Sequence, residues 1–285
     1  MNTDKYPWLN DLTSPKAAEA IDNARKQFHN TGAVTFPNFL TEKALEECVK
    51  DATAQEDSAF TTDDTHTAYL APPDASYLDN SVYNHEMRTQ VASVAFDELT
   101  QGSKLAELYK NPTMLQLVSS IVQKQLYLSE DPIGCCSINV FRPMYHHSFH
   151  FDESEFSTTL MLQEAERPDT GLFQYTDPLR DTSTDLTLSQ VAATIRAHDT
   201  KSNVDFAELL PTTRQQAQPP PKLRTLDFRA GTLSIFSGSR SLHRVTKVEG
   251  SRSRLVAVLT FATRPGFRNS AKVQELFWGR SSGPE

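Results

Sequence analysis

The stretch that decides the fold is Phe149-His150-Phe151-Asp152, in which aromatic and polar side chains alternate. Successive side chains of a β-strand point to opposite faces, so this alternation predicts a strand that carries His150 and Asp152 on one face. A His-x-Asp tripeptide also arises by chance, because acidic residues are common in proteins. The strand pattern is what favours a shared role for the two side chains as ligands of one metal ion.

A second glycine-bounded strand pattern leads to another histidine. Residues 232–236 lie between Gly231 and Gly238, and His243 follows shortly after them. Two imidazoles and one carboxylate form the facial set that holds non-haem Fe(II) and leaves coordination positions open. His150, Asp152 and His243 are therefore the predicted metal ligands and catalytic centre. The alternative is a structural or adventitious metal in a jelly-roll binding protein.

Arg254 begins a third strand pattern. Residues 254–261 are mostly aliphatic, and Arg254, Val256 and Thr260 fall on one face. An inward guanidinium needs an anion, because an unpaired buried charge is unfavourable and a carboxylate fits its planar fork. The anion is either an acidic side chain or the carboxylate of a cosubstrate such as 2-oxoglutarate. The three predicted metal ligands favour the cosubstrate.

Together these residues resemble the Fe(II)/2-oxoglutarate-dependent dioxygenase superfamily, and within it the carrier-independent amino-acid halogenases and hydroxylases. The resemblance implies a mainly β fold with flanking helices around a double-stranded β-helix, a core of the jelly-roll or cupin type. The matching segments lie between about residues 66 and 266: Ala68-Tyr69-Leu70, residues 150–156, 160–163, 171–175 and 178–180, and Ser241 to Thr246.

The resemblance also implies a reaction. Fe(II), 2-oxoglutarate and O2 would serve to hydroxylate an unactivated C–H bond of a small polar substrate, a free amino acid with or without a cationic side chain. Halogenases of this family have a small residue at the position of the carboxylate ligand, so Asp152 favours hydroxylation. The alternatives are hydroxylation of another small metabolite or of a peptide side chain, and a catalytically silent barrel that binds 2-oxoglutarate or metal.

Four further residues are predicted to contact the substrate. His147 and Arg88 match family positions that contact the substrate and receive its carboxylate, Glu153 would bind an amine, and Trp278 would close the pocket. Each has an ordinary alternative: a surface histidine, an exposed helical arginine, a solvated carboxylate and a packing aromatic.

Two more residues are predicted near the cosubstrate. Asn139 shares a strand face with Phe141 and could reach the second carboxylate of 2-oxoglutarate, although a side-chain bond to backbone is the ordinary alternative. Thr260 shares the face of Arg254 and could bind cosubstrate or substrate, and it ranks below Arg254.

Composition excludes several classes of protein. The chain has 285 residues and a net charge of −8 without a cluster of Lys and Arg, which argues against a nucleic-acid partner. Its three cysteines lack a C-x-x-C spacing, which argues against a zinc site or a disulfide framework. No signal pattern or long apolar run predicts a membrane segment. We expect a cytoplasmic enzyme with a small-molecule substrate, and nothing predicts its oligomeric state.

The layout predicts one domain over residues 1–285. Residues 1–130 would be a mostly helical support with a long loop at 60–81 that serves as a lid, and residues 131–266 would form the barrel. An insert at 181–222, with a short helix near 188–197, would interrupt the barrel, and residues 267–285 would be a tail. Caps at Ser14 and Thr41 predict two N-terminal helices, the first of which ends at Gly32.

Overall fold

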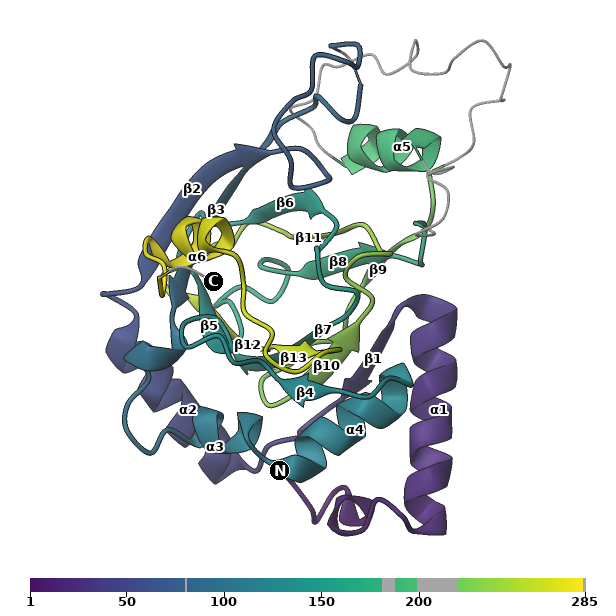
Figure 1. The fold of residues 1–285 in the computed structure, drawn as a ribbon, viewed down its shortest axis with the longest axis vertical. Coiled ribbons are helices and arrows are strands. Elements are labelled where there is room, and N and C mark those ends of the chain that lie inside the picture. Colours follow the sequence, from purple (N-terminus) through teal and green to yellow (C-terminus); the bar gives the residue numbers. More distant parts are fainter. Residues whose placement is uncertain (80, 181–187, 199–219, 284–285) are drawn as a thin grey trace.

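The computed structural model describes residues 1–79, 81–180, 188–198 and 220–283. Within these residues two main antiparallel sheets form the core (Figure 1). The larger sheet runs in the order β1 (Ala33–Phe36), β10 (Leu233–Phe236), β7 (Ser157–Gln163), β12 (Arg254–Leu259), β5 (Cys136–Phe141), β3 (Met87–Val94), β2 (Phe60–His66). The smaller sheet has the order β6 (His147–His150), β11 (His243–Val245), β8 (Phe173–Thr176), β9 (Leu223–Thr225). A short ladder joins β4 (Tyr127–Leu128) to β13 (Phe261–Ala262).

The order of the strands confirms the predicted fold class. From β5 onward the chain passes back and forth between the two sheets: β5, β7, β10 and β12 belong to the larger sheet, and β6, β8, β9 and β11 belong to the smaller one. This antiparallel crossing between facing sheets is the jelly-roll arrangement of a double-stranded β-helix. The core therefore lies between the sheets, and a second apolar layer lies outside the larger one.

Strand β12 shows how the larger sheet is buried on both faces. Leu255, Ala257 and Leu259 point outward into the apolar cluster beneath the helices. Val256 points inward and packs with Met161 in the cluster between the sheets. The near-continuous aliphatic run in this strand follows from that double burial, since both faces exclude water.

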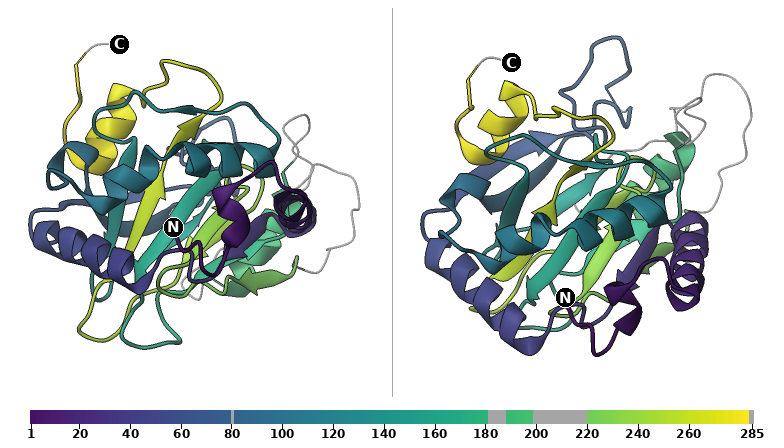
Figure 2. Two further views of the ribbon diagram at one scale, coloured as in Figure 1. Left: turned by 90° about the horizontal axis from the view of Figure 1, so that it is seen from below. Right: turned by 60° about the horizontal axis from the view of Figure 1, so that its bottom comes forward.

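Helices cover the outer face of the larger sheet (Figure 2). The Ser14 side chain caps the first of them, and Gly32 ends it in a left-handed conformation with φ of 77°. Thr41 caps the second. Both caps confirm the prediction. The helices and single turns of this layer are η1 (Pro7–Asn10), α1 (Pro15–Thr31), α2 (Glu42–Gln55), η2 (Phe96–Glu98), α3 (Lys104–Tyr109) and α4 (Pro112–Val122).

Two more helices lie near the barrel. Helix α5 (Leu188–His198) confirms the short helix predicted near residues 188–197. Its Val191 and Ile195 belong to one apolar cluster with Phe149 and Phe151, the neighbours of His150. The rest of the predicted insert at 181–222 lies largely outside the described residues, so its role as a lid stays a prediction. Helix α6 (Ala271–Trp278) packs against β2 and β3 within the predicted tail.

The N-terminal third differs from the prediction in one respect. The predicted loop at 60–81 begins with β2, which pairs with β3 from Phe60 opposite Ser93 to His66 opposite Met87. Residues 1–130 thus supply three strands of the larger sheet as well as helices. The polar run of β2 forms a strand because it is the edge of this sheet and exposes one face to water.

The buried anchors of the fold include thiols and one carboxylate. Cys48, Cys135 and Cys136 are buried and form no disulfide. Asp131 is 1% exposed and accepts hydrogen bonds from the backbone of Gly134 and the side chain of Gln274, which ties α6 to the barrel.

Among the described residues, no helix has the length and apolar character needed to cross a membrane.

Candidate metal centre and cosubstrate pocket

The predicted metal ligands come together between β6 and β11. His150 and His243 are direct cross-strand partners, and Asp152 follows β6 by two residues. The His150 Nε2 lies 3.4 Å from Asp152 Oδ1, and the His243 Nε2 lies 3.3 Å from the same oxygen. One ligand atom from each residue falls within 4.8 Å of the other two. This confirms that the strands bring the three side chains to one point.

Both histidines are held in the tautomer that a metal needs. The Nδ1 of His150 lies 2.8 Å from the Ser148 carbonyl, and the Nδ1 of His243 lies 2.9 Å from the Ser241 carbonyl. A carbonyl only accepts, so each Nδ1 carries the proton and each Nε2 keeps its lone pair. Such outer hydrogen bonds fix the ring orientation of metal-binding histidines.

The Asp152 carboxylate is oriented just as firmly. Ser157 Oγ donates to Asp152 Oδ2 at 2.6 Å, which leaves Oδ1 facing the two imidazoles. The Asp152 backbone N–H donates to the Gly238 carbonyl at 3.0 Å. A Cβ at position 238 would overlap the Asp152 carboxylate, so this approach requires glycine.

Burial and mutual charge set the protonation of the site. Burial and the facing His243 lower the pKa of His150 to about 4. Burial alone would raise the pKa of Asp152, but His243 and His150 hold it well below its usual value. At neutral pH the site therefore offers a neutral His150 and a carboxylate, which is the state that binds a divalent cation.

His147 also faces this site, contrary to simple strand alternation. Along β11 the step from His243 to Val245 is two residues, whereas along β6 the matching step from His150 to His147 is three. This β-bulge turns His147 to the side of His150, on which its ring stacks at 3.8 Å. Burial, followed by the neighbouring His150, lowers the pKa of His147 well below its usual value.

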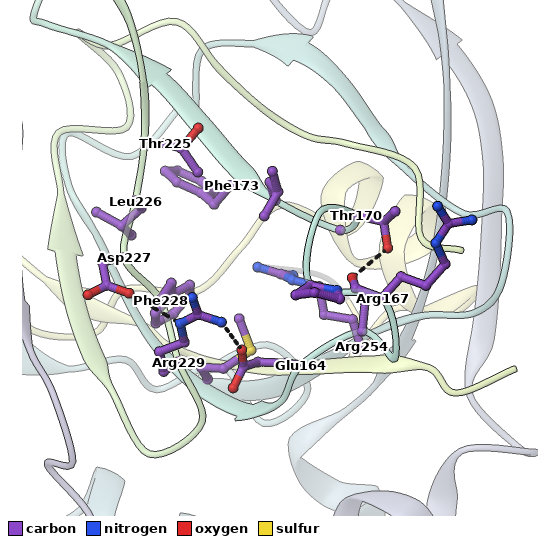
Figure 3. A pocket seen from close by; sticks show the side chains of 15 residues that line it. Glu164, Arg167, Thr170, Phe173, Thr225, Leu226, Asp227, Phe228, Arg229 and Arg254 are labelled. Carbon is purple, nitrogen blue, oxygen red and sulfur yellow. Dashed lines mark hydrogen bonds and ion pairs between the residues drawn. The ribbon is translucent and has the colours of Figure 1, made fainter. Parts of the chain in front are cut away.

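Arg254 lines a cavity of about 260 Å³ (Figure 3). Its side chain is 2% exposed, and its guanidinium carbon lies 5.2 Å from the centre of the Phe141 ring and 6.0 Å from that of Phe228. Its Nε has no hydrogen-bond partner in the part of the chain that the structure describes. Within the described residues, no Asp or Glu side chain forms an ion pair with Arg254. The alternative that an acidic side chain of the protein neutralises Arg254 is therefore not seen there.

The carboxylate that most influences Arg254 already has other partners. Glu164 accepts a hydrogen bond from Arg229 at 3.0 Å (Figure 3) and another from the Ala230 backbone N–H at 3.0 Å. Burial lowers the pKa of Arg254 to about 9, and Glu164 only partly opposes this. Because the described residues give Arg254 no ion-pair partner, a carboxylate anion would be favoured beside its guanidinium.

Phe173 links the cavity to the metal ligands. Its ring lines the cavity and lies 5.5 Å from the His243 ring, centre to centre. Phe173 is thus shared between the lining of the Arg254 cavity and the surroundings of His243, and none of the three metal ligands lines that cavity itself.

The structure places the other two predicted cosubstrate residues apart from this cavity. Asn139 lies opposite Val256 on the inner side of β5, and it accepts a long hydrogen bond of 3.5 Å from Ser93. Thr260 lies beyond the end of β12, where its hydroxyl donates to the Gly134 carbonyl at 3.1 Å. Neither residue lines the Arg254 cavity, and the Thr260 hydroxyl proton already has a backbone acceptor.

The other three residues predicted to contact the substrate do not gather at the metal ligands as His147 does. Arg88 lies on β3 rather than on a helix, and a two-point ion pair at 2.7 Å joins it to Asp63. Its side chain is 58% exposed. Glu153 is exposed in the loop after Asp152. Trp278 ends α6 beside Gly134, and its buried indole nitrogen has no hydrogen-bond partner among the described residues. The substrate roles of these residues stay predictions.

Sequence patterns missed three residues of the site. Ser157 and Gly238 hold Asp152, as described above, and His66 lies edge-on to His147 and His150 at 5.7 and 5.9 Å between ring centres. Burial lowers the pKa of His66. The roles of Ser157 and His66 are visible only in their tertiary contacts. Gly238 has a sequence signal, because a glycine at the end of a strand pattern can mark a place where another chain segment approaches the backbone closely.

Comparison with known proteins shows the fold. No family model matches the chain, and no curated protein matches it in sequence. The solved structures that resemble it include the non-haem α-ketoglutarate-dependent epimerase SnoN of nogalamycin biosynthesis, with 13% identity, 85% of this chain and 80% of that chain covered, and a TM-score of 0.52. The α-ketoglutarate-dependent carbocyclase SnoK of the same biosynthesis has 14% identity, coverage of 92% and 93%, and a TM-score of 0.51. AviO1 from Streptomyces viridochromogenes has 11% identity, coverage of 86% and 96%, and a TM-score of 0.50. The chain shares the double-stranded β-helix of these proteins.

Proposed function

We propose that the protein is an Fe(II)/2-oxoglutarate-dependent oxygenase. The observation that carries the proposal is a preorganised His150, Asp152 and His243 set in the same barrel as a buried Arg254 that forms no ion pair within the described residues. The donor set suits Fe(II), since two imidazoles and one carboxylate leave positions for a chelating cosubstrate and for O2. SnoN and SnoK, which share the fold, are described as α-ketoglutarate-dependent, in agreement with this chemistry.

The two ends of 2-oxoglutarate would have separate partners. Arg254 would hold the distal carboxylate with its planar guanidinium, while Phe141 and Phe228 keep that ion pair away from water. The 2-oxo acid end would face the metal ligands past Phe173. With iron bound, the cosubstrate and O2 supply an oxidant that removes hydrogen from an unactivated C–H bond, and the protein supplies orientation and exclusion of water.

Hydroxylation is the expected outcome. Asp152 Oδ1 faces both imidazoles and Ser157 holds the other oxygen, so with iron bound the carboxylate would take the position that a halide would need. Assays in excess chloride or bromide should therefore give an oxygenated product without halogen. A halogenated product would show that Asp152 is not a ligand.

For the substrate we propose a small polar molecule, with a free amino acid as the leading class. The neutral His147 stacked on His150 offers a polar contact directly beside the metal ligands. Glu153 follows the ligand Asp152 and supplies a carboxylate for an amine. The ion pair of Arg88 with Asp63 gives Arg88 less support as the carboxylate receptor than His147 has as a contact. Another small metabolite or a peptide side chain is the second candidate.

Coupled product analysis tests this function. Protein loaded anaerobically with Fe(II) and 2-oxoglutarate is exposed to air with a panel of amino acids, while succinate, O2 uptake and a gain of one oxygen are measured. His150→Ala, Asp152→Ala and His243→Ala should each abolish succinate formation. His29→Ala provides a matched control, because His29 is exposed on α1 and within the described part of the chain its ring hydrogen-bonds the Gln123 side chain, away from the metal ligands.

The outcomes also separate an enzyme from a silent barrel. Binding of iron and 2-oxoglutarate without succinate release, over the whole panel, would favour a 2-oxoglutarate-binding module. A triad variant with full activity and stoichiometric iron would refute the assigned centre.

A further inference from the structure

The β6 bulge removes Ser148 from the β-ladder. Val245 pairs with His147 and His243 pairs with His150, so the residues between them have no direct partner on β11. A buried or half-buried backbone group without a partner destabilises the fold, so the polar groups of Ser148 need partners elsewhere.

Each polar group of Ser148 finds such a partner. Its backbone N–H donates to Thr89 Oγ1 at 3.1 Å, and its hydroxyl donates to the Arg88 carbonyl at 2.6 Å. Its carbonyl accepts the Nδ1 proton of the ligand His150 at 2.8 Å. Ser148 thus connects β3 directly to a metal ligand.

Thr89 is in turn held by His66. The His66 Nδ1 lies 2.9 Å from the Thr67 carbonyl and must carry a proton to bond it. The neutral ring then presents Nε2 as an acceptor, so the Thr89 hydroxyl donates to it at 2.7 Å. That donation points an oxygen lone pair of Thr89 at the Ser148 N–H. Thr89 is 2% exposed, so water does not compete for these bonds.

We propose that His66 and Thr89 are positioning residues that hold the β6 bulge, and through it the orientation of His150 and His147 at the metal centre. The inference rests on the proposed metal centre. His66 acts in two ways: its hydrogen bonds orient Thr89, and its ring makes a T-shaped contact with each of the stacked His147 and His150 rings. Without Thr89 Oγ1, the Ser148 amide lacks its partner and the carbonyl that orients His150 is released.

The effect should appear in metal binding itself. Loss of a partner behind a metal ligand commonly weakens metal affinity by roughly 10–100-fold. Titration of the apoprotein with Co(II), followed by visible absorption, measures both the affinity and the ligand geometry without turnover. Thr89→Val should weaken Co(II) binding by about 10-fold or more and alter the absorption bands. Thr89→Ser retains the hydroxyl and should show the Co(II) affinity and the absorption bands of the wild type.

Thr62→Val is the matched control. Thr62 lies on the neighbouring strand β2, is 6% exposed, and loses one hydrogen bond of 2.6 Å to the Leu276 carbonyl when it is replaced. It should lower thermal stability to a similar extent and leave Co(II) affinity within about twofold, because its bond leads away from the metal ligands. His66→Phe keeps an aromatic ring but loses both hydrogen bonds, and it should weaken Co(II) binding as Thr89→Val does.

The outcomes are distinct. Wild-type Co(II) affinity and spectrum in Thr89→Val, or an equal loss in Thr62→Val, would overturn the inference. Wild-type behaviour of His66→Phe would overturn the part assigned to His66. A wild-type protein that binds neither Co(II) nor Fe(II) would instead refute the proposed metal centre, so the two failures can be told apart.

Discussion

Replacement of Arg254 by methionine should stabilise the protein and remove its response to 2-oxoglutarate. The pKa of Arg254 falls from 12.5 to about 9, chiefly through burial, and at neutral pH the group is still charged. That fall corresponds to an unfavourable free energy on the order of 5 kcal/mol for the ligand-free folded state. Contacts with the Phe141 and Phe228 rings return about 1–2 kcal/mol.

Arg254→Met should therefore raise the free energy of unfolding of the ligand-free protein by about 1–4 kcal/mol, since a flexible apolar side chain fills the site without a buried charge. With Mn(II) present, 2-oxoglutarate at 100 times its Kd should add about 2.7 kcal/mol to the wild type and nothing to the variant. Urea unfolding with and without 2-oxoglutarate measures both quantities.

Arg229→Met is the control for this experiment. Arg229 also lines the cavity, but its side chain is 65% exposed and bonded to Glu164. Its replacement should change the stability by no more than about 1 kcal/mol and preserve the response to 2-oxoglutarate. If Arg254→Met were destabilised and still gained stability from 2-oxoglutarate, Arg254 would be a structural residue and not the anchor of the cosubstrate.

Three further substitutions test the neighbourhood of the site. Gly238→Ala should abolish Fe(II) binding in a folded protein, because its Cβ would overlap the Asp152 carboxylate, and unchanged iron content would contradict this. Ser157→Ala should weaken Fe(II) affinity by about 10-fold, measured by titration, since Asp152 loses the bond to Oδ2. Asp131→Asn should lower the free energy of unfolding by about 1–3 kcal/mol. Although burial alone raises the pKa of Asp131, bonds from Gly134 and Gln274 lower it below the unfolded value of 3.8. Its contribution is thus present above about pH 4, and it is lost as the pH falls through the folded pKa. An acid-unfolding profile identical to wild type would count against that role.

Local patterns were sufficient where one strand or one helix end decides the position. Alternation alone places His150 and Asp152 on one face, and it places Arg254 on the inner side of β12 with Val256. The caps at Ser14 and Thr41 are equally local, because each satisfies backbone groups within its own helix.

Other parts of the site depend on distant partners. Alternation predicts opposite faces for His147 and His150, and the bulge that unites them arises from pairing with β11, about a hundred residues later. The polar run at 60–66 becomes a strand only because β3 pairs with it. Arg88 resembles a substrate-binding arginine in sequence, whereas the same pairing of β2 with β3 sets it beside Asp63.

The buried thiols have a consequence for experiments on this protein. Burial raises the pKa of Cys48 and of Cys135 to about 12, and it raises that of Cys136 well above its ordinary value. At neutral pH these groups remain thiols, and the thiolate is the form that attacks alkylating reagents and captures soft metals. The folded chain should therefore resist alkylation, and any slow labelling would time the openings of the core around α2 and β5. The labelling rates of the three native cysteines, measured by mass spectrometry, would thus report the rate of local unfolding without an introduced probe.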